Sequence, residues 1–349
     1  MVTSSYPRSD DDPAGHFVRS SAEALARGGD EVHVIAPGGS MLDPPAREGR
    51  LVVHRAGGGA LFGWPGALAR AREAPWRLLA AGPFAAGVIK RLRDLGPVDR
   101  AVAHWIIPCA FPLLLPGPRV PLEVHAHGAD VRLLLRSPAR SREAILGGLL
   151  DRGARFAFAA RSLLDALAAA LPPPLSGALI DASRIEPPAI DIPDVDARAR
   201  SIRAGLALAP GERLAVTACR LIASKRVDLA IAAARTASPP VRLAVIGDGP
   251  ERPTVERLAE PSGPAIRLLG ALPRREALAW IAAADVLLHP SSTEAAPTVV
   301  REARALGVPV VACAAGDIAS WAEDDSALII AEPTAEALAS ALGRISARY

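Results

Sequence analysis

Residues 284–313 read ADVLLHPSSTEAAPTVVREARALGVPVVAC, and this stretch decides which fold we expect. The short apolar run at 286–288 predicts a buried strand. Pro297 opens a segment that stops before Gly307, as helices do. Residues 308–313 then predict a second strand. Strand, loop, helix and strand in this order form the repeating unit of a sheet whose strands run parallel.

Two glutamates, Glu294 and Glu302, lie on either side of the start of this helix. Thr298 and Glu302 are four residues apart and therefore share one helix face. Backbone N–H groups at the helix start, Thr298 and Val299, favour an anion such as a diphosphate, and a carboxylate one turn further on can accept both hydroxyls of a ribose. The pattern predicts a pocket for a sugar nucleotide. The plainer alternative is a loop cap at Glu294 and a solvated side chain at Glu302.

The same stretch resembles the E-x7-E region of the retaining glycosyltransferases of family four, the glycosyl transferases group 1, which have the two-domain GT-B fold. Ala295 stands where that family usually has glycine. The resemblance implies an α/β chain with two Rossmann-like domains, whose parallel sheets face each other across a cleft. The residues that match the family pattern are Glu294, Pro297, Glu302, Ala303, Ala305, Gly307, Pro309, Val310 and Val311.

With 349 residues the chain is long enough for two domains, each with its own core. The proline-rich stretch SRIEPPAIDIP at 183–193 predicts the break between them. We expect an N-terminal, acceptor-side Rossmann-like domain at 1–186 and a C-terminal Rossmann-like domain at 187–349 that binds the nucleotide sugar. The last predicted helix, 335–345, closes the second domain or packs back on the first.

The composition indicates a protein of the cytoplasm. A net charge of +3 is too small to indicate nucleic acid as a partner. Cys109, Cys219 and Cys313 stand singly, which favours a reducing compartment. The longest apolar run, 78–89, is too short to cross a bilayer, and the first residues lack the cationic start and apolar core of a signal peptide. We therefore expect a cytoplasmic protein that can work at the inner face of the membrane.

The N-terminal residues show the same order of elements. A short strand ends by residue 5, an amphipathic helix follows near 17–27, and a strand follows at 31–36. This order is typical of the opening of a parallel sheet. The family resemblance implies that Gly15, just before the helix, brings the backbone close to the donor phosphates and the acceptor. Any strand-to-helix turn can use a glycine, so this residue is weak evidence by itself.

Histidines follow two further predicted strands of the N-terminal half. His104 precedes Trp105, and residues 125–130 read HAHGAD. Residues at the carboxyl ends of parallel strands face the ligand crevice. The second segment resembles the H-G-x-D element of the family, which implies sugar-facing roles for His127 and Asp130, and His104 joins them on the sugar or acceptor side. The alternative is a metal bound by the H-x-H pair, for which the sequence places no third ligand.

Two cations follow the first predicted strand of the C-terminal half, 214–218. Arg220 and Lys225 are five residues apart across a loop, close enough to place both charges on one diphosphate. They resemble the G-R-x-x-x-x-K-G element of the family, with Cys219 and Arg226 in place of its glycines. A pair of surface cations is the alternative.

Residues 247–251 read GDGPE and follow another predicted strand. The third glycine of a dinucleotide fingerprint is absent, which disfavours that kind of site. The segment matches a turn that the family places near the nucleotide base. The resemblance therefore assigns Gly247 and Gly249 to donor binding.

Residues 61–93 combine aromatic and apolar side chains with basic ones. Such a composition suits a helix that lies in an anionic membrane surface, where a lipid-linked acceptor would be found. The alternative is a pair of helices packed on the N-terminal sheet with solvated arginines. The side chains that carry this pattern are Trp64, Trp76, Phe84, Arg70, Arg72, Arg77, Lys90, Arg91 and Arg93.

The resemblance implies transfer of a hexosyl group from a UDP- or GDP-sugar to an acceptor hydroxyl, with retention at the anomeric carbon, in polysaccharide or glycolipid synthesis. Arg220, Lys225 and the helix start would stabilise the departing diphosphate. Glu302 would hold the ribose and Glu294 would face the donor sugar. His127 would approach from the other domain to contact the sugar or steer the acceptor hydroxyl.

No metal and no cofactor beyond the donor is required by this scheme. The D-x-D spacings at 10–12 and 194–196 lie in loop-like segments and are read as solvated acids. Three other functions stay open. One is a sugar-nucleotide epimerase of the same fold, and another is a nucleotide-sugar-binding subunit that has lost catalysis. The third is a peripheral membrane scaffold built on 61–93.

Overall fold

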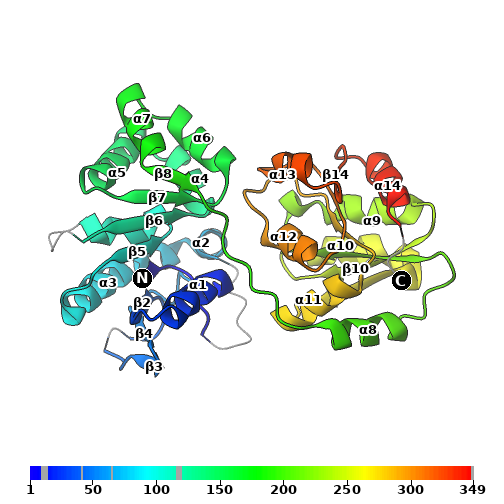
Figure 1. Ribbon diagram of the computed structural model, residues 1–349, viewed down its shortest axis with the longest axis horizontal. Helices are drawn as coiled ribbons and strands as arrows, with labels where there is room; N and C mark the ends of the chain where they lie inside the picture. Colours follow the sequence, from blue (N-terminus) through cyan, green and yellow to red (C-terminus); the bar gives the residue numbers. More distant parts are fainter. Residues whose placement is uncertain (9–14, 41, 64–65, 115–119, 347–349) are drawn as a thin grey trace. The chain divides into compact units, whose positions relative to one another are not determined.

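The chain folds into two compact units, Met1–Ala189 and Ile190–Tyr349 (Figure 1). The computed structural model describes residues 1–8, 15–40, 42–63, 66–114 and 120–346, without the side chains of residues 68 and 69. Residues 10–12 and Trp64, on which the sequence analysis drew, lie outside the described residues. The contacts divide the chain after Ala189, whereas we placed the boundary after residue 186.

In its described part, the N-terminal unit has an eight-stranded sheet with the order β3-β4-β2-β1-β5-β6-β7-β8. Neighbouring strands are parallel except β3 and β4, which form an antiparallel pair at one edge. The strand order reverses between β1 and β5. The strands are β1 (Val2–Thr3), β2 (Val32–Ala36), β3 (Ala46–Glu48), β4 (Leu51–Arg55), β5 (Ala101–His104), β6 (Leu122–Ala126), β7 (Arg155–Phe158) and β8 (Ser183–Ile185).

Helices cover both faces of this sheet, and Figure 1 shows α1 and α3 on opposite faces. Short 3-10 or π turns lie at Pro75–Ala80, Ile106–Ala110 and Phe111–Leu114. The helices of the unit are α1 (His16–Arg27), α2 (Ala67–Glu73), α3 (Ala81–Leu95), α4 (Ala129–Arg136), α5 (Ala139–Asp151), α6 (Arg161–Ala169) and α7 (Pro173–Asp181).

In its described part, the C-terminal unit has a six-stranded sheet, all of whose pairs are parallel, with the order β11-β10-β9-β12-β13-β14. The order reverses between β9 and β12. The expected pair of largely parallel sheets is therefore confirmed. The strands are β9 (Arg213–Ala218), β10 (Val241–Ile246), β11 (Ile266–Gly270), β12 (Val286–His289), β13 (Val310–Ala312) and β14 (Leu328–Ile330).

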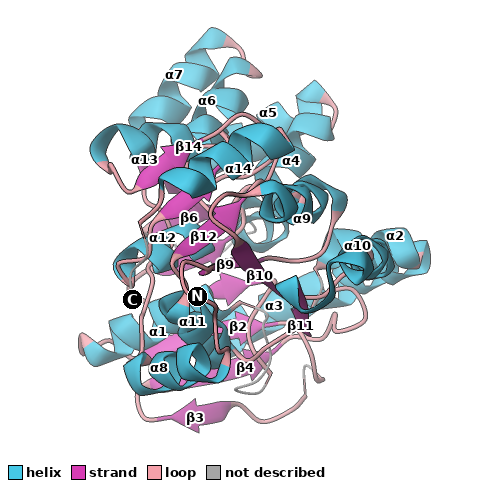
Figure 2. Ribbon diagram, turned by 90° about the vertical axis from the view of Figure 1, so that its right-hand side faces the viewer, coloured by secondary structure: helices cyan, strands magenta, loops and turns pink. Residues whose placement is uncertain are grey.

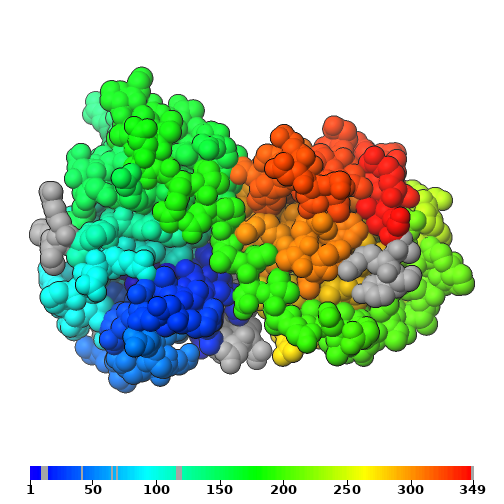
Figure 3. Space-filling view, in the orientation of Figure 1, coloured from blue at the N-terminus to red at the C-terminus, as the bar shows by residue number. Residues whose placement is uncertain are grey.

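The helices of the C-terminal unit pack on both faces of its sheet. One face meets α8, α11, α12 and α13, and the other meets α9, α10 and α14. The segments from α12 to α14, coloured orange to red, gather on one side of the unit in Figure 3. The helices are α8 (Asp196–Gly205), α9 (Val227–Thr236), α10 (Arg252–Ala259), α11 (Arg274–Ala283), α12 (Thr298–Ala305), α13 (Ile318–Asp324) and α14 (Ala335–Arg344), with 3-10 turns at Ala223–Lys225 and Glu260–Ala265.

Strand β9 shows why this unit could be predicted from hydrophobic runs. Leu214 and Val216 face the core under α8 and α11, which lie side by side in Figure 1 and Figure 2, while Ala215 faces the core under α9 and α14. Successive side chains of a strand point to opposite faces, so a strand covered on both sides is apolar throughout. The last helix, α14, packs on α9 and β13 of its own unit.

Several elements of the N-terminal unit differ from our expectation, and the strand pair β3 and β4 was not predicted. We read 183–193 as the linker, but Ser183–Ile185 is the edge strand β8. This strand is short and only partly buried, so it lacks the apolar run that marks an inner strand. We also missed β7, whose Arg155–Phe158 begins with an exposed arginine and directly precedes the alanine-rich helix.

Residues 61–93 combine a helix that packs on the N-terminal unit with an exposed aromatic turn. Helix α3 packs on its unit through Phe84 and Val88, and buried Arg91 donates hydrogen bonds to backbone carbonyl oxygens rather than lying in solvent. The turn Pro75–Ala80 has no buried residue and leaves Trp76 64% exposed. Among the helices of the described residues, none is long and apolar enough to span a bilayer.

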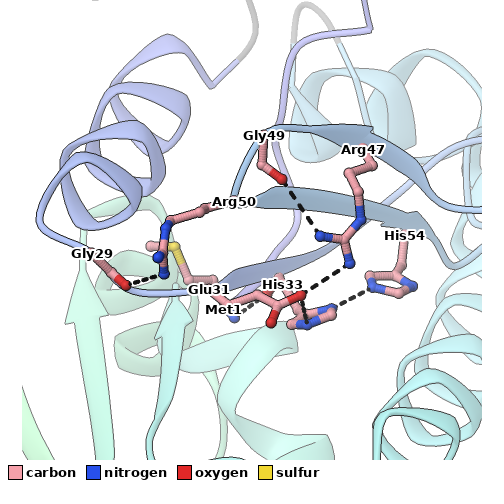
Figure 4. Close-up of polar contacts among 8 residues, drawn as sticks. All are labelled: Met1, Gly29, Glu31, His33, Arg47, Gly49, Arg50 and His54. Carbon is pink, nitrogen blue, oxygen red and sulfur yellow. Dashed lines mark hydrogen bonds and ion pairs between the residues drawn. The ribbon is translucent and has the colours of Figure 1, made fainter.

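A polar cluster lies on β2 and β4 near the edge of the N-terminal sheet (Figure 4). The His33 Nδ1 and His54 Nε2 atoms are 2.9 Å apart, and the two rings stack. Glu31 accepts a 3.0 Å hydrogen bond from Arg47 and lies 3.7 Å from the His33 ring nitrogen. Burial is the first cause that lowers the pKa of His54, to about 4, followed by the charges of neighbouring basic groups.

Candidate functional site

The loops that follow β9 and β12 begin where the strand order of the C-terminal sheet reverses. The two strands are adjacent and parallel, but the next strands lie on opposite sides of them. Loops at such a point diverge and leave a crevice at the carboxyl ends of the strands, where α/β proteins bind ligands. The loop after β9 carries Arg220 and Lys225, and the loop after β12 carries Glu294.

Lys225, Glu294 and His289 form one connected group at this end of the sheet. The Lys225 Nζ lies 2.5 Å from the Glu294 Oε1, and the His289 Nε2 lies 2.8 Å from the same oxygen. His289 is the last residue of β12, and Glu294 lies in the loop between β12 and α12. The Glu294 side chain is only 9% exposed, so the ion pair is largely shielded from water.

The Glu294 carboxylate is ionised in this setting. Burial by itself would raise its pKa, but the hydrogen bond from His289 and the charge of Lys225 lower the pKa to about 2. An ionised carboxylate only accepts hydrogen bonds, so His289 carries a proton on Nε2 and donates it. We expected Glu294 to face the donor sugar; in the structure its Oε1 holds Lys225 and His289.

Backbone contacts fix the two loops relative to each other. The Ser292 N–H and hydroxyl both donate to the Ser224 carbonyl, at 2.9 and 3.2 Å. Gly316, in the loop after β13, also packs closely on the Glu294 loop. A Cβ on Gly316 would lie 2.5 Å from the Ala295 carbonyl oxygen, so only glycine permits this approach. The loop that carries Glu294 thus contacts both the loop after β9 and the loop after β13.

The GDGPE turn supports the loop that carries Arg220. A Cβ on Gly247 would lie 1.8 Å from the Cys219 carbonyl oxygen, and one on Gly249 would lie 2.4 Å from the Leu221 carbonyl oxygen. The Leu221 N–H also donates to the Asp248 carbonyl at 2.9 Å. Both glycines therefore have a packing reason inside the protein, in addition to the donor-binding role that the resemblance assigns to them.

Helix α12 brings the other predicted donor-binding residues to the same end of the sheet. Thr298 and Val299 form its first turn and are partly buried, with Glu302 one turn further on. The Glu302 Oε1 accepts a 2.7 Å hydrogen bond from Arg274, the first residue of α11. The C-terminal unit thus holds cations, a helix start and a carboxylate within one group of loops.

His104 and His127 form a hydrogen-bonded pair in the N-terminal unit. Their strands, β5 and β6, are adjacent, and the His104 Nδ1 and His127 Nε2 atoms are 3.0 Å apart. The rings of Phe17 and Trp105 lie 4.8 and 5.0 Å from that of His127. Burial lowers the pKa of His127 to about 3, with a further contribution from His125. His127 is therefore neutral near pH 7, with one ring nitrogen as a hydrogen-bond donor and the other as an acceptor.

Asp130 has a different place from the one we expected. It is 2% exposed, and its carboxylate accepts hydrogen bonds from the backbone N–H groups of Ile106, His127 and Gly128. These bonds join the loops after β5 and β6, so Asp130 supports the histidine pair instead of facing a sugar. Burial raises the pKa of Asp130 against the effect of these hydrogen bonds.

Gly15 lies at the N-cap of α1 with a φ of 70°. A Cβ there would lie 2.3 Å from the Ser5 carbonyl oxygen, so the helix start packs directly on the loop after β1. The strand order of this unit reverses between β1 and β5, which places Gly15 and His104 at the carboxyl ends of the two strands at that point.

The N-terminal unit should lose stability as the pH falls from 7 to 5, because neutral histidines are buried in it. In the unfolded chain a histidine has a pKa of about 6.5. Between pH 7 and 5 the unfolded state therefore takes up protons that the folded state does not. The free energy of unfolding then falls by up to about 1.4 kcal/mol per pH unit for each such histidine. The histidines with a lowered pKa in this unit are His33, His54, His104 and His127.

Thermal melting between pH 7 and 5, with hydrogen exchange to assign each transition to a unit, measures this effect. His54→Leu should reduce the slope. The C-terminal unit is the internal comparison, since its described residues contain a single histidine, His289. A free energy of unfolding of the N-terminal unit that stays constant over this range would contradict the prediction.

Sequence reasoning missed two residues of the candidate site, His289 and Arg274. His289 ends an apolar strand, which is the same signal that marked His104, so the sequence could have identified it. Arg274 has no such signal, because a basic residue at a helix start is common on protein surfaces. Among the described residues, no group of three or more His, Cys, Asp and Glu side chains is placed to hold a metal ion.

Comparison with known proteins shows which proteins the C-terminal unit is similar to. Residues 212–348 match the model of the family described as glycosyl transferases group 1. These residues contain every element of the C-terminal site, from the loop after β9 to helix α12.

Two curated relatives differ in how much of the chain they match. The chain is 37% identical over 164 residues to the D-inositol 3-phosphate glycosyltransferase of Xylanimonas cellulosilytica, a match that spans 43% of this chain and 39% of the relative. It is 28% identical over 283 residues to a provisionally named teichuronic acid biosynthesis glycosyltransferase of Bacillus subtilis, across 78% of this chain and 69% of the relative. The first match thus covers less than half of that relative's length.

Among solved structures, HepE of Anabaena in complex with UDP is similar over 98% of this chain and 87% of that chain. The TM-score is 0.65 and the sequence identity is 17%. At this identity the likeness shows the fold, which is the GT-B fold of two units with largely parallel sheets.

Proposed function

We propose that the chain belongs to glycosyl transferases group 1, whose model matches residues 212–348, and that it transfers a hexosyl group from a UDP- or GDP-sugar to an acceptor hydroxyl, with retention at the anomeric carbon. The observation that carries this proposal is the Lys225–Glu294–His289 group, which lies where the strand order of the C-terminal sheet reverses, beside the start of α12.

The diphosphate is the part of the donor that this group suits best. Negative charge develops on the diphosphate as the bond to the sugar breaks, and a cation held in place before the reaction stabilises that charge. Glu294 holds the ammonium of Lys225 in one position. Arg220 and the N–H groups at Thr298 and Val299 supply further positive potential. In this scheme the reaction requires no cofactor beyond the nucleotide sugar.

Glu294 has two tasks in this proposal. It orients Lys225, and its ionised carboxylate lies in the loop before α12, where the hexosyl group would follow the diphosphate. We propose transfer on the face from which the diphosphate departs, since that route keeps the configuration at the anomeric carbon. Glu302 accepts the ribose hydroxyls one turn into α12, and the turn at Gly247 and Gly249 holds the loop that faces the diphosphate.

We assign His127 to the acceptor side of the reaction. Its neutral ring can accept or donate one hydrogen bond to a hydroxyl. The Nε2 atom of His127 is hydrogen-bonded to His104. The Asp130 carboxylate accepts a hydrogen bond from the His127 backbone N–H and so fixes the position of this residue. Gly15 allows the start of α1 to approach the same end of the sheet.

The acceptor class follows from the relatives and from one surface. The names of the two curated relatives refer to an inositol phosphate and to teichuronic acid, so we propose a carbohydrate or lipid-linked acceptor. Trp76, Leu78 and Leu79 are 56–79% exposed on one turn, next to the arginines of α2. This combination fits peripheral contact with an anionic membrane, and we propose that the enzyme works in the cytoplasm at that surface.

A nucleotide panel tests the donor site directly. Saturating UDP or GDP should raise the melting temperature, because a ligand that binds only the folded state stabilises it by about 2.7 kcal/mol at 100 times its Kd. Glu302→Ala should abolish most of this shift. Glu336→Ala, an exposed glutamate on α14, is the matched control and should keep the full shift.

The outcomes separate the functions that the sequence left open. Absence of a shift with every nucleotide would overturn the proposed donor site. A shift with isomerisation of the sugar and no transfer would identify an epimerase. A shift without turnover on any acceptor panel would identify a binding subunit, and liposome binding without nucleotide affinity would identify a membrane scaffold.

A further inference from the structure

Arg274 connects the predicted ribose-binding glutamate to the first residues of the C-terminal unit. Its Nη2 donates to the Glu302 Oε1 at 2.7 Å and to the backbone carbonyl of Asp191 at 2.6 Å. Helices α11 and α12, which carry Arg274 and Glu302, are in contact. The Glu302 side chain is 13% exposed and that of Arg274 is 30% exposed, so the pair is partly shielded from water.

The next residue, Arg275, also contacts the first residues of the C-terminal unit, but among the described residues no contact with Glu302 is seen for it. Its Nη2 donates to the backbone carbonyl of Asp194 at 3.0 Å. Both arginines thus attach the segment 190–195 to the start of α11. Of the two arginines, Arg274 also donates to Glu302. Arg275 is therefore a control for the effect of attaching segment 190–195 to α11.

The contact with Arg274 restricts how Glu302 can present its carboxylate. A glutamate has several rotatable side-chain torsions, and a charge-assisted hydrogen bond to one oxygen selects among them. Each carboxylate oxygen can accept more than one hydrogen bond, so Oε1 and Oε2 can still receive two neighbouring hydroxyls. A carboxylate held in this way distinguishes a ligand with two adjacent hydroxyls from a ligand with one.

We infer that Arg274 is a positioning residue that orients Glu302 toward the 2′ and 3′ hydroxyls of the ribose, and thereby sets the preference for ribonucleoside over 2′-deoxyribonucleoside diphosphates. This inference rests on the proposed function, because it takes Glu302 as the residue that receives the ribose. In this scheme Arg274 touches no part of the donor and acts only through Glu302.

The test compares two ligands on a set of variants by isothermal titration calorimetry. The ligands are UDP and 2′-deoxy-UDP, or the guanosine pair if the wild type binds that base. The wild type should prefer the ribonucleotide by about 10-fold or more, the size of one hydrogen bond to a charged group. Arg274→Gln should reduce this ratio at least threefold, mainly through weaker binding of the ribonucleotide.

Two further variants make the result specific. Arg275→Gln should leave the ratio of the two Kd values unchanged, since that side chain attaches the same segment without the contact to Glu302. Arg274→Lys should keep part of the preference for the ribonucleotide, because lysine keeps the positive charge but lacks the planar guanidinium group of arginine. In the Glu302→Gln background, Arg274→Gln should cause no further change in the ratio.

Several results would overturn the inference. An equal loss of affinity for both ligands in Arg274→Gln would mean that the arginine supports only the fold, and a similar fall of the ratio in Arg275→Gln would mean that the attached segment matters instead. If the wild type binds neither ligand, the proposed donor site itself fails. If it binds both and Glu302→Gln lowers the ratio while Arg274→Gln does not, the donor site stands and the role of Arg274 is wrong.

Discussion

Replacing Lys225 with methionine should lower the rate of glycosyl transfer by about 100-fold or more while leaving the C-terminal unit folded. Methionine keeps an unbranched apolar stem and removes the ammonium. Glu294 then loses the charge 2.5 Å away that helps to keep its pKa near 2, and the departing diphosphate loses a cation. Both changes raise the barrier, because preorganised charge acts most strongly where water is excluded.

Steady-state kinetics that follow release of the nucleoside diphosphate measure this effect. The chain offers an unusually clean control, since its sequence contains only two lysines, Lys90 and Lys225. Lys90 pairs with Asp94 on the exposed side of α3, so Lys90→Met should leave the rate unchanged. Retention of more than a tenth of the activity in Lys225→Met would show that Lys225 is a structural partner of Glu294 and not part of the catalytic group.

Gly247→Ala should destabilise the C-terminal unit by at least about 3 kcal/mol, the scale of the largest single-residue effects. The new Cβ would lie 1.8 Å from the Cys219 carbonyl oxygen, and the φ of 134° is unfavourable for any residue with a side chain. Because backbone and not a flexible side chain stands in the way, the whole loop that carries Arg220 must shift. Donor binding should fall together with stability.

Denaturant unfolding, with hydrogen exchange to follow the C-terminal unit, gives the measurement. Gly205→Ala is the matched control in the same unit. It ends helix α8 with no atom within 4 Å of the added Cβ, so that change should be neutral or slightly stabilising. A loss below about 1 kcal/mol in Gly247→Ala would mean that the GDGPE turn can move away from the loop after β9 at little cost.

The C-terminal unit could be predicted well because its local patterns are strong. Inner parallel strands such as β9 and β12 are largely apolar, and Pro297 and Gly307 mark the limits of α12 closely. In the N-terminal unit the edge strand β8 is too short and too polar to be recognised. Its pairing with β7 depends on the rest of the sheet, which a local pattern does not contain.

The sequence by itself determined the fold class, the order of most elements of the C-terminal unit and the ends of strands at which polar residues gather. Only the tertiary structure decided which of those residues touch. Lys225 meets Glu294 across 69 residues of sequence, and Arg274 meets Glu302 across 28. Asp130 binds backbone N–H groups of two loops instead of facing outward. Local periodicity encodes local conformation, whereas these contacts arise only when parallel strands bring distant loops to one edge of a sheet.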